Sequence, residues 1–140
     1  MANYIQNGGF EQSTAGSTNP SPFWSGVNVL VEGNGNQLLG VNNIRIDVGG
    51  FIFQTLSLVV GREYTFKAAI RNAGNSGGSL EIFITGNPIK NFNTGVMTRE
   101  PYAFYEFDFT ATNAVSNLVI GHSSGSSIRF DVISVVPVKL

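Results

Sequence analysis

The sequence predicts an all-β fold, an antiparallel β-sandwich. Hydrophobic residues recur with a period of two along most of the chain, which is the pattern of strands with one buried face. Short runs of Gly, Asn and Ser interrupt this alternation at the spacing of tight turns. Helical spacing is almost absent. About eight to ten short strands separated in this way are typical of a sandwich or barrel, and we expect one domain over residues 1–140.

The two ends of the chain indicate how the sandwich closes. The opening Asn7-Gly8-Gly9-Phe10-Glu11 has an apparent counterpart in the apolar run at 128–135, and we expect these segments to be the first and last strands of a jelly roll. Each carries an acidic residue, Glu11 after a Gly-Gly turn and Asp131 inside the apolar run. An ionised carboxylate in such a place needs a cation, hydrogen-bond donors or solvent. A structural metal bound by both is the simplest hypothesis.

A second explanation of these carboxylates uses no metal. Glu11 would accept hydrogen bonds from nearby backbone N–H groups, and Asp131 would pair with Arg129 or Arg45. The sequence leaves both explanations open.

The remaining strands follow in order between the two ends. Alternation is clearest in six segments, at 27–32, 43–48, 51–58, 64–71, 80–85 and 103–110. Turn-forming runs lie between them at 33–36, 49–50 and 72–78, and another follows at 123–126. The stretch 13–22, rich in Ser, Thr, Gly and Pro, is expected to form a long first loop or a hinge.

The apolar faces of these strands define a predicted core. It comprises Phe10, Trp24, Val29, Ile44, Ile46, Ile52, Leu56, Tyr64, Phe66, Ile82, Ile84, Tyr105, Phe107, Phe109, Leu118, Ile120 and Ile133. Truncation of a buried Phe usually costs about 3 to 5 kcal/mol, which is the expectation for Phe107→Ala.

Composition excludes several classes of function. Eight basic and nine acidic residues are scattered along the chain, for a net charge of -1, so there is no basic patch for nucleic acid or an anionic membrane. The absence of cysteine excludes disulfides, thiolate metal sites and a cysteine nucleophile. No apolar run approaches the ~20 residues of a membrane helix. Residues 1–4 lack the basic and apolar regions of a secretory signal, so we expect either that a signal has been removed or that the protein leaves its cell by another route.

Motifs for catalysis are weak, and the sequence predicts a protein without enzymatic activity. His122 is the sole histidine, and no Gly-x-Ser-x-Gly turn precedes a helix, so a Ser-His-Asp arrangement lacks its parts. Glu106 and Asp108 share one strand face at roughly 7 Å, a separation that glycosidases use. Adjacent acids on an exposed strand are nevertheless more often a solvated face.

The strand at 51–58 has two apolar faces. Ile52, Gln54 and Leu56 share one face, and Phe51 and Phe53 share the other, so both faces cannot belong to the core. We expect a loop or the opposing sheet to cover the two phenylalanines. The alternative is that they contact a partner subunit or a sugar ring.

Three other strands combine aromatic and polar residues on the face opposite the core. This outward set includes Arg71, Phe83, Tyr102, Phe104 and Glu106. Aromatic rings can stack on the apolar face of a sugar while carboxylates and Arg bind its hydroxyl groups. The same composition would serve a protein interface or an ordinary solvated surface, and the sequence does not separate these.

The chain resembles the jelly-roll carbohydrate-binding modules found beside bacterial glycanases. The shared pattern is the opening at 7–11, a middle strand with Gln54 followed by an apolar run through Gly61 to Tyr64, and a closing strand with Asp131. The first two pieces are more similar still to a domain at the N-terminus of collagen-like surface proteins of spore-forming bacilli. The carbohydrate-binding resemblance implies that Glu11 and Asp131 would bind a buried calcium, completed by backbone carbonyls.

Two hypotheses of function follow. The first is a non-catalytic assembly module of a bacterial surface layer or filament, such as the outer layer of a spore (exosporium), extracellular and self-associating through strand edges and termini. Tyr4, Ile5, Val138 and Leu140 would provide its apolar contacts, by strand addition from neighbouring molecules. The alternative is a carbohydrate-binding module that recognises glycans through the aromatic and polar sheet face.

Overall fold

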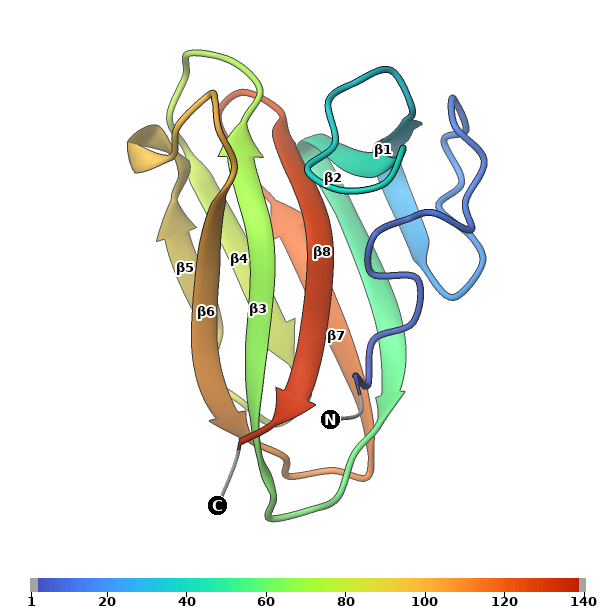
Figure 1. Ribbon diagram of the computed structural model, residues 1–140. Coiled ribbons are helices and arrows are strands. Elements are labelled where there is room, and N and C mark those ends of the chain that lie inside the picture. Colours follow the sequence, from blue (N-terminus) through green and yellow to red (C-terminus); the bar gives the residue numbers. More distant parts are fainter. Residues whose placement is uncertain (1–2, 139–140) are drawn as a thin grey trace.

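The computed structural model describes residues 3–138, which form an antiparallel β-sandwich of eight strands (Figure 1). In chain order they are β1 (Ser25–Glu32), β2 (Asn43–Ser57), β3 (Glu63–Asn72), β4 (Ser79–Ile84), β5 (Lys90–Asn93), β6 (Ala103–Thr110), β7 (Val115–His122) and β8 (Ile128–Pro137). A single 3-10 turn, η1 (Thr94–Val96), is the only helix among these residues. No helix there has the length and hydropathy needed to cross a membrane.

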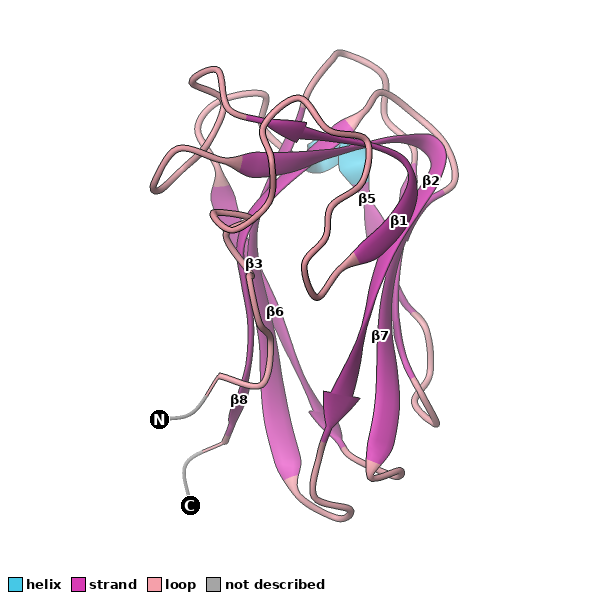
Figure 2. Cartoon of the chain, turned by 90° about the vertical axis from the view of Figure 1, so that its right-hand side faces the viewer, coloured by secondary structure: helices cyan, strands magenta, loops and turns pink. Residues whose placement is uncertain are grey.

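The strands form one continuous sheet that curls into two layers, in the order β5-β4-β7-β2-β8-β3-β6 with β1 paired to β2. Figure 2 shows β6, β3 and β8 in one layer and β7 in the other. β2 belongs to both: Ile44 to Ile46 pair with β8, and residues 51–57 pair with β7. The all-β prediction is therefore confirmed, and β2 is the strand that joins the two layers.

A glycine corner lets β2 pass between the layers. Gly49 has a φ of 82°, and a Cβ on Gly50 would lie 2.6 Å from the carbonyl oxygen of Asn28 on β1. Only glycine fits this contact and this backbone conformation. The pairing of β1 with β2 shifts register at the same place, between Val27 and Val29. As a result Val29 is buried and Val27 is exposed.

The opening segment is a turn that lies against β8, and the prediction that residues 7–11 form a strand is wrong. Asn7 and Phe10 both have positive φ, which breaks regular strand pairing. Gly8 touches β8 directly: its carbonyl oxygen accepts a hydrogen bond from Ile133 N–H (2.9 Å), and a Cβ on Gly8 would lie 2.1 Å from the Ile133 oxygen. The first and last segments are thus neighbours, as predicted, through a turn in place of a strand pair.

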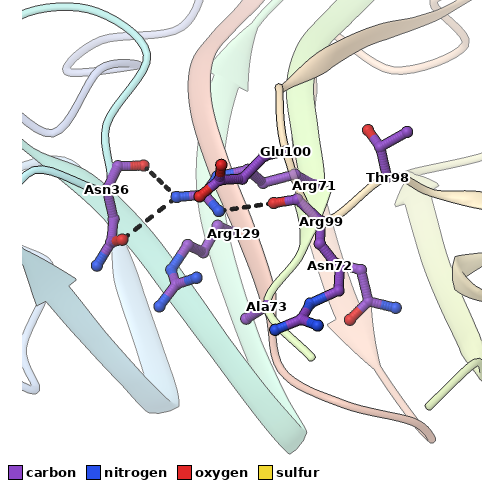
Figure 3. A pocket seen from close by; sticks show the side chains of 8 residues that line it. All are labelled: Asn36, Arg71, Asn72, Ala73, Thr98, Arg99, Glu100 and Arg129. Carbon is purple, nitrogen blue, oxygen red and sulfur yellow. Dashed lines mark hydrogen bonds between the residues drawn. The ribbon is translucent and has the colours of Figure 1, made fainter. Parts of the chain in front are cut away.

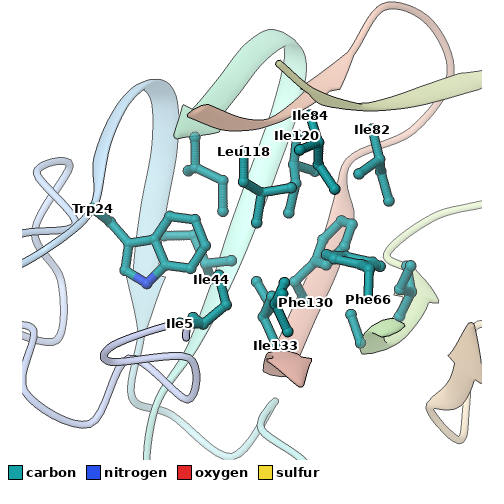
Figure 4. Packing of buried hydrophobic residues seen from close by; sticks show 14 of the residues in the cluster. Ile5, Trp24, Ile44, Phe66, Ile82, Ile84, Leu118, Ile120, Phe130 and Ile133 are labelled. Carbon is teal, nitrogen blue, oxygen red and sulfur yellow. The ribbon is translucent and has the colours of Figure 1, made fainter. Parts of the chain in front are cut away.

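The core lies between the two layers (Figure 4). Most predicted core residues are buried, with Trp24, Tyr64 and Phe66 among the largest side chains that are completely enclosed. Tyr105 and Phe107 differ from the prediction: they are only partly buried, because β6 is an edge strand and their rings pack beside Phe92 of the opposite edge at the open side of the sandwich.

A β-bulge in β8 determines which of its residues face the core. Lys67 of β3 pairs with Ser134, whereas Ala69 pairs with Asp131, so β8 has one extra residue between these points. Val132 occupies this position with a φ of 53°, a conformation that is strained for a β-branched residue. The bulge allows both Phe130 and Ile133 to be buried in the core and turns Asp131 toward the loop that precedes β2.

Candidate binding site

The residues predicted to bind a glycan or a partner lie on two opposite faces of the molecule. Arg71, Tyr102, Phe104 and Glu106 lie on the outer face of the β6-β3-β8 layer, since their strand neighbours Ile70 and Phe109 are buried. Phe51, Phe53 and Phe83 lie on the outer face of the β4-β7-β2 layer, paired across β7. The structure therefore divides the predicted set into two surfaces.

A hollow of about 570 Å³ lies at one end of the first surface (Figure 3). Its walls come from the loop before β2, the end of β3, the loop before β6 and the start of β8. The lining residues are Asn36, Arg71, Asn72, Ala73, Thr98, Arg99, Glu100 and Arg129. Of the residues predicted to bind a glycan or a partner, Arg71 lines this hollow.

Arg71 forms part of the wall and is held in place by its neighbours. Its Nη1 donates to the backbone oxygen of Arg99 (2.8 Å), and its Nη2 donates to the backbone oxygen of Asn36 (3.1 Å). The ring of Tyr102 lies 4.9 Å from the guanidinium carbon, a cation–π contact. The Tyr102 hydroxyl also donates to Asn36 (2.7 Å). These bonds hold the loop that contains Asn36 against the end of β3 and the start of β6.

Tyr102 stays an uncharged phenol at neutral pH. Burial raises its pKa to about 12, and the neighbouring Arg71 opposes this only in part. The ring therefore presents an aromatic face and a hydroxyl donor, without adding negative charge to the hollow.

An exposed aromatic and polar strip continues along the same face. Phe104 is 53% exposed, and the ammonium nitrogen of Lys67 lies 4.8 Å from its ring centroid. Glu106 pairs in register with Lys67, and further along the strip Thr65 donates to Asp108 (2.6 Å). An open aromatic ring beside hydrogen-bonding groups and a hollow provides both kinds of contact that a saccharide requires.

Glu32 lies at the centre of a charged network beside the hollow. It is buried, accepts from Arg129 Nε (2.7 Å) and Asn43 (3.0 Å), and lies 3.5 Å from Arg45. Burial alone would raise the pKa of this carboxyl, but the hydrogen bonds from Arg129 and Asn43 outweigh it and hold the pKa below its usual value. Arg45 pairs in addition with Asp47 (2.9 Å).

The opposite face contains the remaining predicted aromatics. Phe51 and Phe53 stack at 6.3 Å between ring centroids, and Phe53 is 36% exposed. Phe83 lies across β7, where Val119 pairs with both Phe53 and Phe83. Phe53 is exposed and Phe51 is partly buried, so the expectation that both phenylalanines are covered is wrong for Phe53. They point outward because the even-numbered residues of β2 face the core.

The structure brings Glu11 and Asp131 close to Gly9, on the side where its Cβ would be. A Cβ on Gly9 would lie 3.6 Å from Asp131 Oδ1 and 3.8 Å from Glu11 Cγ. Asp131 accepts from the N–H groups of Leu38 (2.8 Å) and Leu39 (3.0 Å), and Glu11 accepts from those of residues 41 and 42. Burial raises the pKa of Asp131, the backbone bonds oppose this, and the charge of Glu11 adds to the increase. Asp131 does not pair with Arg129 or Arg45 within 4.0 Å.

Of the residues expected to support assembly, Ile5 is in the core and only 4% exposed, so the prediction that it is exposed is wrong. It is enclosed because the segment before the first turn runs along β8, where Tyr4 N–H donates to Val135 (2.8 Å). Tyr4 is partly buried against the edge of Tyr64. Val138 is partly buried, and Leu140 lies outside the described residues.

His122 is buried beneath the sheet and does not line the hollow. Its Nδ1 lies 3.2 Å from the backbone oxygen of Ile46. Glu106 and Asp108 are exposed on the outer face, one beside Lys67 and the other bonded to Thr65.

Of the eight residues that line the hollow, sequence reasoning identified only Arg71; those it missed include Asn36, Arg99 and Arg129. Arg129 did carry a signal, because it alternates with the buried Ile128 and Phe130 and so had to face outward. Asn36 and Arg99 are in loops, where periodicity says nothing about position.

No protein-family model matches the chain, and no curated protein is significantly similar to it. Solved structures do share its fold. A family 16 carbohydrate-binding module is 16% identical, with a TM-score of 0.68 over 96% of this chain and 99% of that one. A family 4 module is 17% identical, with a TM-score of 0.66 over 96% and 99%.

A third similar structure is a family 61 module solved with β-1,4-galactotriose. It is 15% identical, with a TM-score of 0.61 over 99% of this chain and 100% of that one. Identities this low establish the fold alone. The chain therefore has the jelly-roll β-sandwich fold of carbohydrate-binding modules.

Proposed function

We propose that this protein is a non-catalytic carbohydrate-binding module that acts outside the cell. The observation that carries the proposal is the combination of exposed Phe104, half-buried Tyr102 and the polar hollow around Arg71 on one face. A saccharide would stack on the open Phe104 ring and place its hydroxyl groups against Asn36, Arg71 and neighbouring polar groups. The fold that the chain shares with carbohydrate-binding modules supports this reading.

The surface-assembly hypothesis has less support. Ile5, one of its apolar contacts, is enclosed, and the solved structures compared above are carbohydrate-binding modules, with no collagen-associated or spore-surface protein among them. Light scattering tests it directly. If the chain is a binding module that does not self-assemble, we expect the full chain to be a monomer in solution. Deletion of residues 1–6 should then leave its oligomeric state unchanged.

Phe104→Ala tests the proposed site, with Phe53→Ala as its matched control. Both phenylalanines are exposed, but they lie on opposite faces. We expect Phe104→Ala to weaken binding to any oligosaccharide found on a glycan array by about 1 kcal/mol or more, the contribution of an aromatic stacking contact. Calorimetric titration of both variants measures this. Equal loss in Phe53→Ala, or loss in that variant alone, would contradict the assignment of the face.

We also propose that Glu11 and Asp131 hold a structural calcium ion. The donors are suitable in kind, because both are carboxylates, Asp131 Oδ1 and Glu11 Oε1 each accept from only one N–H group, and both residues line one hollow together with Gly9. A bound cation would also offset the burial and, with it, the charge of Glu11, which together raise the pKa of Asp131. Among residues 3–138 no cluster of three His, Asp or Glu side chains accompanies them, so backbone oxygens would complete the shell.

Chelation tests the calcium proposal. Because an ion that binds only the folded chain stabilises it by mass action, EDTA should lower the melting temperature and added Ca²⁺ should restore it. Glu11→Gln should remove the difference between the two conditions. An unchanged melting temperature would leave the backbone N–H groups as the sole partners of both carboxylates.

A further inference from the structure

Three arginines from adjacent strands lie side by side next to the hollow. Arg129 of β8 pairs in register with Arg45 of β2 on one side and with Arg71 of β3 on the other. Like charges directly opposite each other in a sheet repel and destabilise it. A row of three cations therefore requires negative charge nearby to offset the repulsion.

Carboxylates of the chain neutralise two of the three. Arg129 and Arg45 both contact Glu32, and Arg45 also contacts Asp47. Arg71 has no carboxylate oxygen within 4.0 Å among residues 3–138. All its hydrogen bonds go to uncharged oxygens of Asn36 and Arg99.

Arg71 is also the most enclosed of the arginines in this row. Only 8% of its surface is exposed, and what remains lines the hollow. Its hydrogen bonds use Nη1 and Nη2 alone, which leaves donor capacity on the guanidinium. A largely desolvated cation without a counter-ion is costly, unless a ligand supplies the missing charge.

Arg99 adds a second unneutralised cation to the same wall. Its guanidinium donates to the side-chain oxygen of Asn75 (2.8 Å) and forms no ion pair among residues 3–138. Glu100 is the one acidic residue that lines the hollow, and it is exposed. Figure 3 shows Arg71, Arg99 and Arg129 around the same opening. The hollow thus has an excess of positive charge although the whole chain has a net charge of -1.

We propose that this hollow selects an acidic sugar residue, whose carboxylate binds Arg71 and Arg99. The proposal rests on the proposed carbohydrate-binding function and specifies its ligand. An arginine fork matches the two oxygens of a carboxylate, and the low exposure of Arg71 strengthens the interaction. The adjoining hollow at Arg45, Asp47 and Arg129 is neutralised by the chain itself. The site therefore accommodates one acidic residue within an otherwise neutral glycan, and does not attract polyanions in general.

Calorimetric titration with a matched pair of ligands tests this proposal. The probes are a xylo-oligosaccharide that carries a single glucuronic acid residue and the same oligosaccharide with that carboxyl group reduced to an alcohol. We expect the acidic form to bind about tenfold tighter or more, the ratio that one charge-assisted hydrogen bond provides. Raising the salt concentration should weaken binding of the acidic form and leave the reduced form nearly unchanged. A sulfated oligosaccharide, as a third probe, distinguishes a carboxylate site from a general oxyanion site, and tighter binding of the sulfated form would overturn the carboxylate assignment.

Arg99→Gln is the decisive variant, because Arg99 is exposed and its replacement leaves the packing of Arg71 intact. It should reduce the preference for the acidic form over the reduced form several-fold, because one of the two guanidinium groups that bind the carboxylate is lost. Arg62→Gln, a change of the same charge outside the hollow, should leave this preference unchanged. Equal binding of both ligands would overturn the proposal and leave the binding module in place. Absence of binding to these probes and to a broad glycan array would overturn the proposed function itself.

Discussion

The contribution of an aromatic side chain to the stability of the core depends on how completely it is buried. Phe66 is completely buried and stacks on Phe107 at 5.1 Å, whereas Phe107 is only partly buried at the open side of the sandwich. The sequence placed both in the core, since alternation shows which face a residue occupies. Alternation does not show that β6 is an edge strand, on which solvent reaches part of the face that points toward the core.

This difference predicts unequal costs of truncation. Phe66→Ala should lower the free energy of unfolding by about 3 to 5 kcal/mol, the cost of emptying a closed phenylalanine site. Phe107→Ala should cost less, because solvent already reaches its ring and can fill the space. Urea denaturation of both variants measures the two values. Equal costs would mean that the side between β5 and β6 is closed.

The Glu32 network predicts a loss of stability in acid. The folded-state pKa of Glu32 is lowered, so its stabilising contribution is fully present above the unfolded value of about 4.3 and disappears as pH falls through the lower folded value. Asp47, whose pKa is also lowered, contributes in the same direction. The melting temperature should therefore decrease below about pH 4.

Glu32→Gln separates this network from other acid effects. It leaves Arg129 and Arg45 without their shared carboxylate and should cost roughly 3 kcal/mol at neutral pH, as removal of one partner from a buried ion pair does. It should also flatten the stability profile between pH 5 and 3. A variant that retains the full acid dependence would show that other carboxylates cause it.

At the scale of elements, the sequence predicted the strands well and their irregularities poorly. Alternation identified the segments that became β2, β3, β4 and β6, because each buries one face and exposes the other. The bulge at Val132 was not predictable, since Phe130 and Ile133 have opposite parity in one apolar run and no local pattern shows where the phase changes. Residues 7–11 were predicted as a strand although Asn7-Gly8-Gly9 is a turn signal; the turn extends to Phe10, whose positive φ no local pattern indicates.

The close contact between Gly8 and β8 predicts that a larger residue at position 8 would destabilise the fold. Gly8→Ala would place a Cβ 2.1 Å from the Ile133 oxygen, so we expect a loss of about 1 to 3 kcal/mol from forced separation of the two segments. Gly121→Ala is the control, because a Cβ there meets nothing within 4 Å, and we expect a change within about 0.5 kcal/mol. Thermal unfolding of both variants gives the comparison, and an unaffected Gly8→Ala would mean that the turn does not rest on β8.

At the scale of the molecule, the sandwich brings together side chains that the sequence could not associate. Arg71 and Tyr102 were recognisable as outward residues of their own strands. Their position beside Asn36 depends on the loop before β2 folding across the ends of β3 and β6, which is a tertiary contact. Phe51, Phe53 and Phe83 were also recognisable as outward aromatic residues, but they lie on the opposite face of the sandwich. Sequence composition could not separate the two sets, because it does not distinguish one outer face from the other.

The most direct test of the central claim is nuclear magnetic resonance mapping of a bound oligosaccharide on the isotopically labelled chain. If the β6-β3-β8 face is the binding site, the backbone signals that shift should cluster at Asn36, Arg71 and residues 99–106. The signals of Phe53 and Phe83 on the opposite face should remain in place. Shifts centred on Phe53 and Phe83, with those of Arg71 and its neighbours unchanged, would contradict the assignment of the binding face.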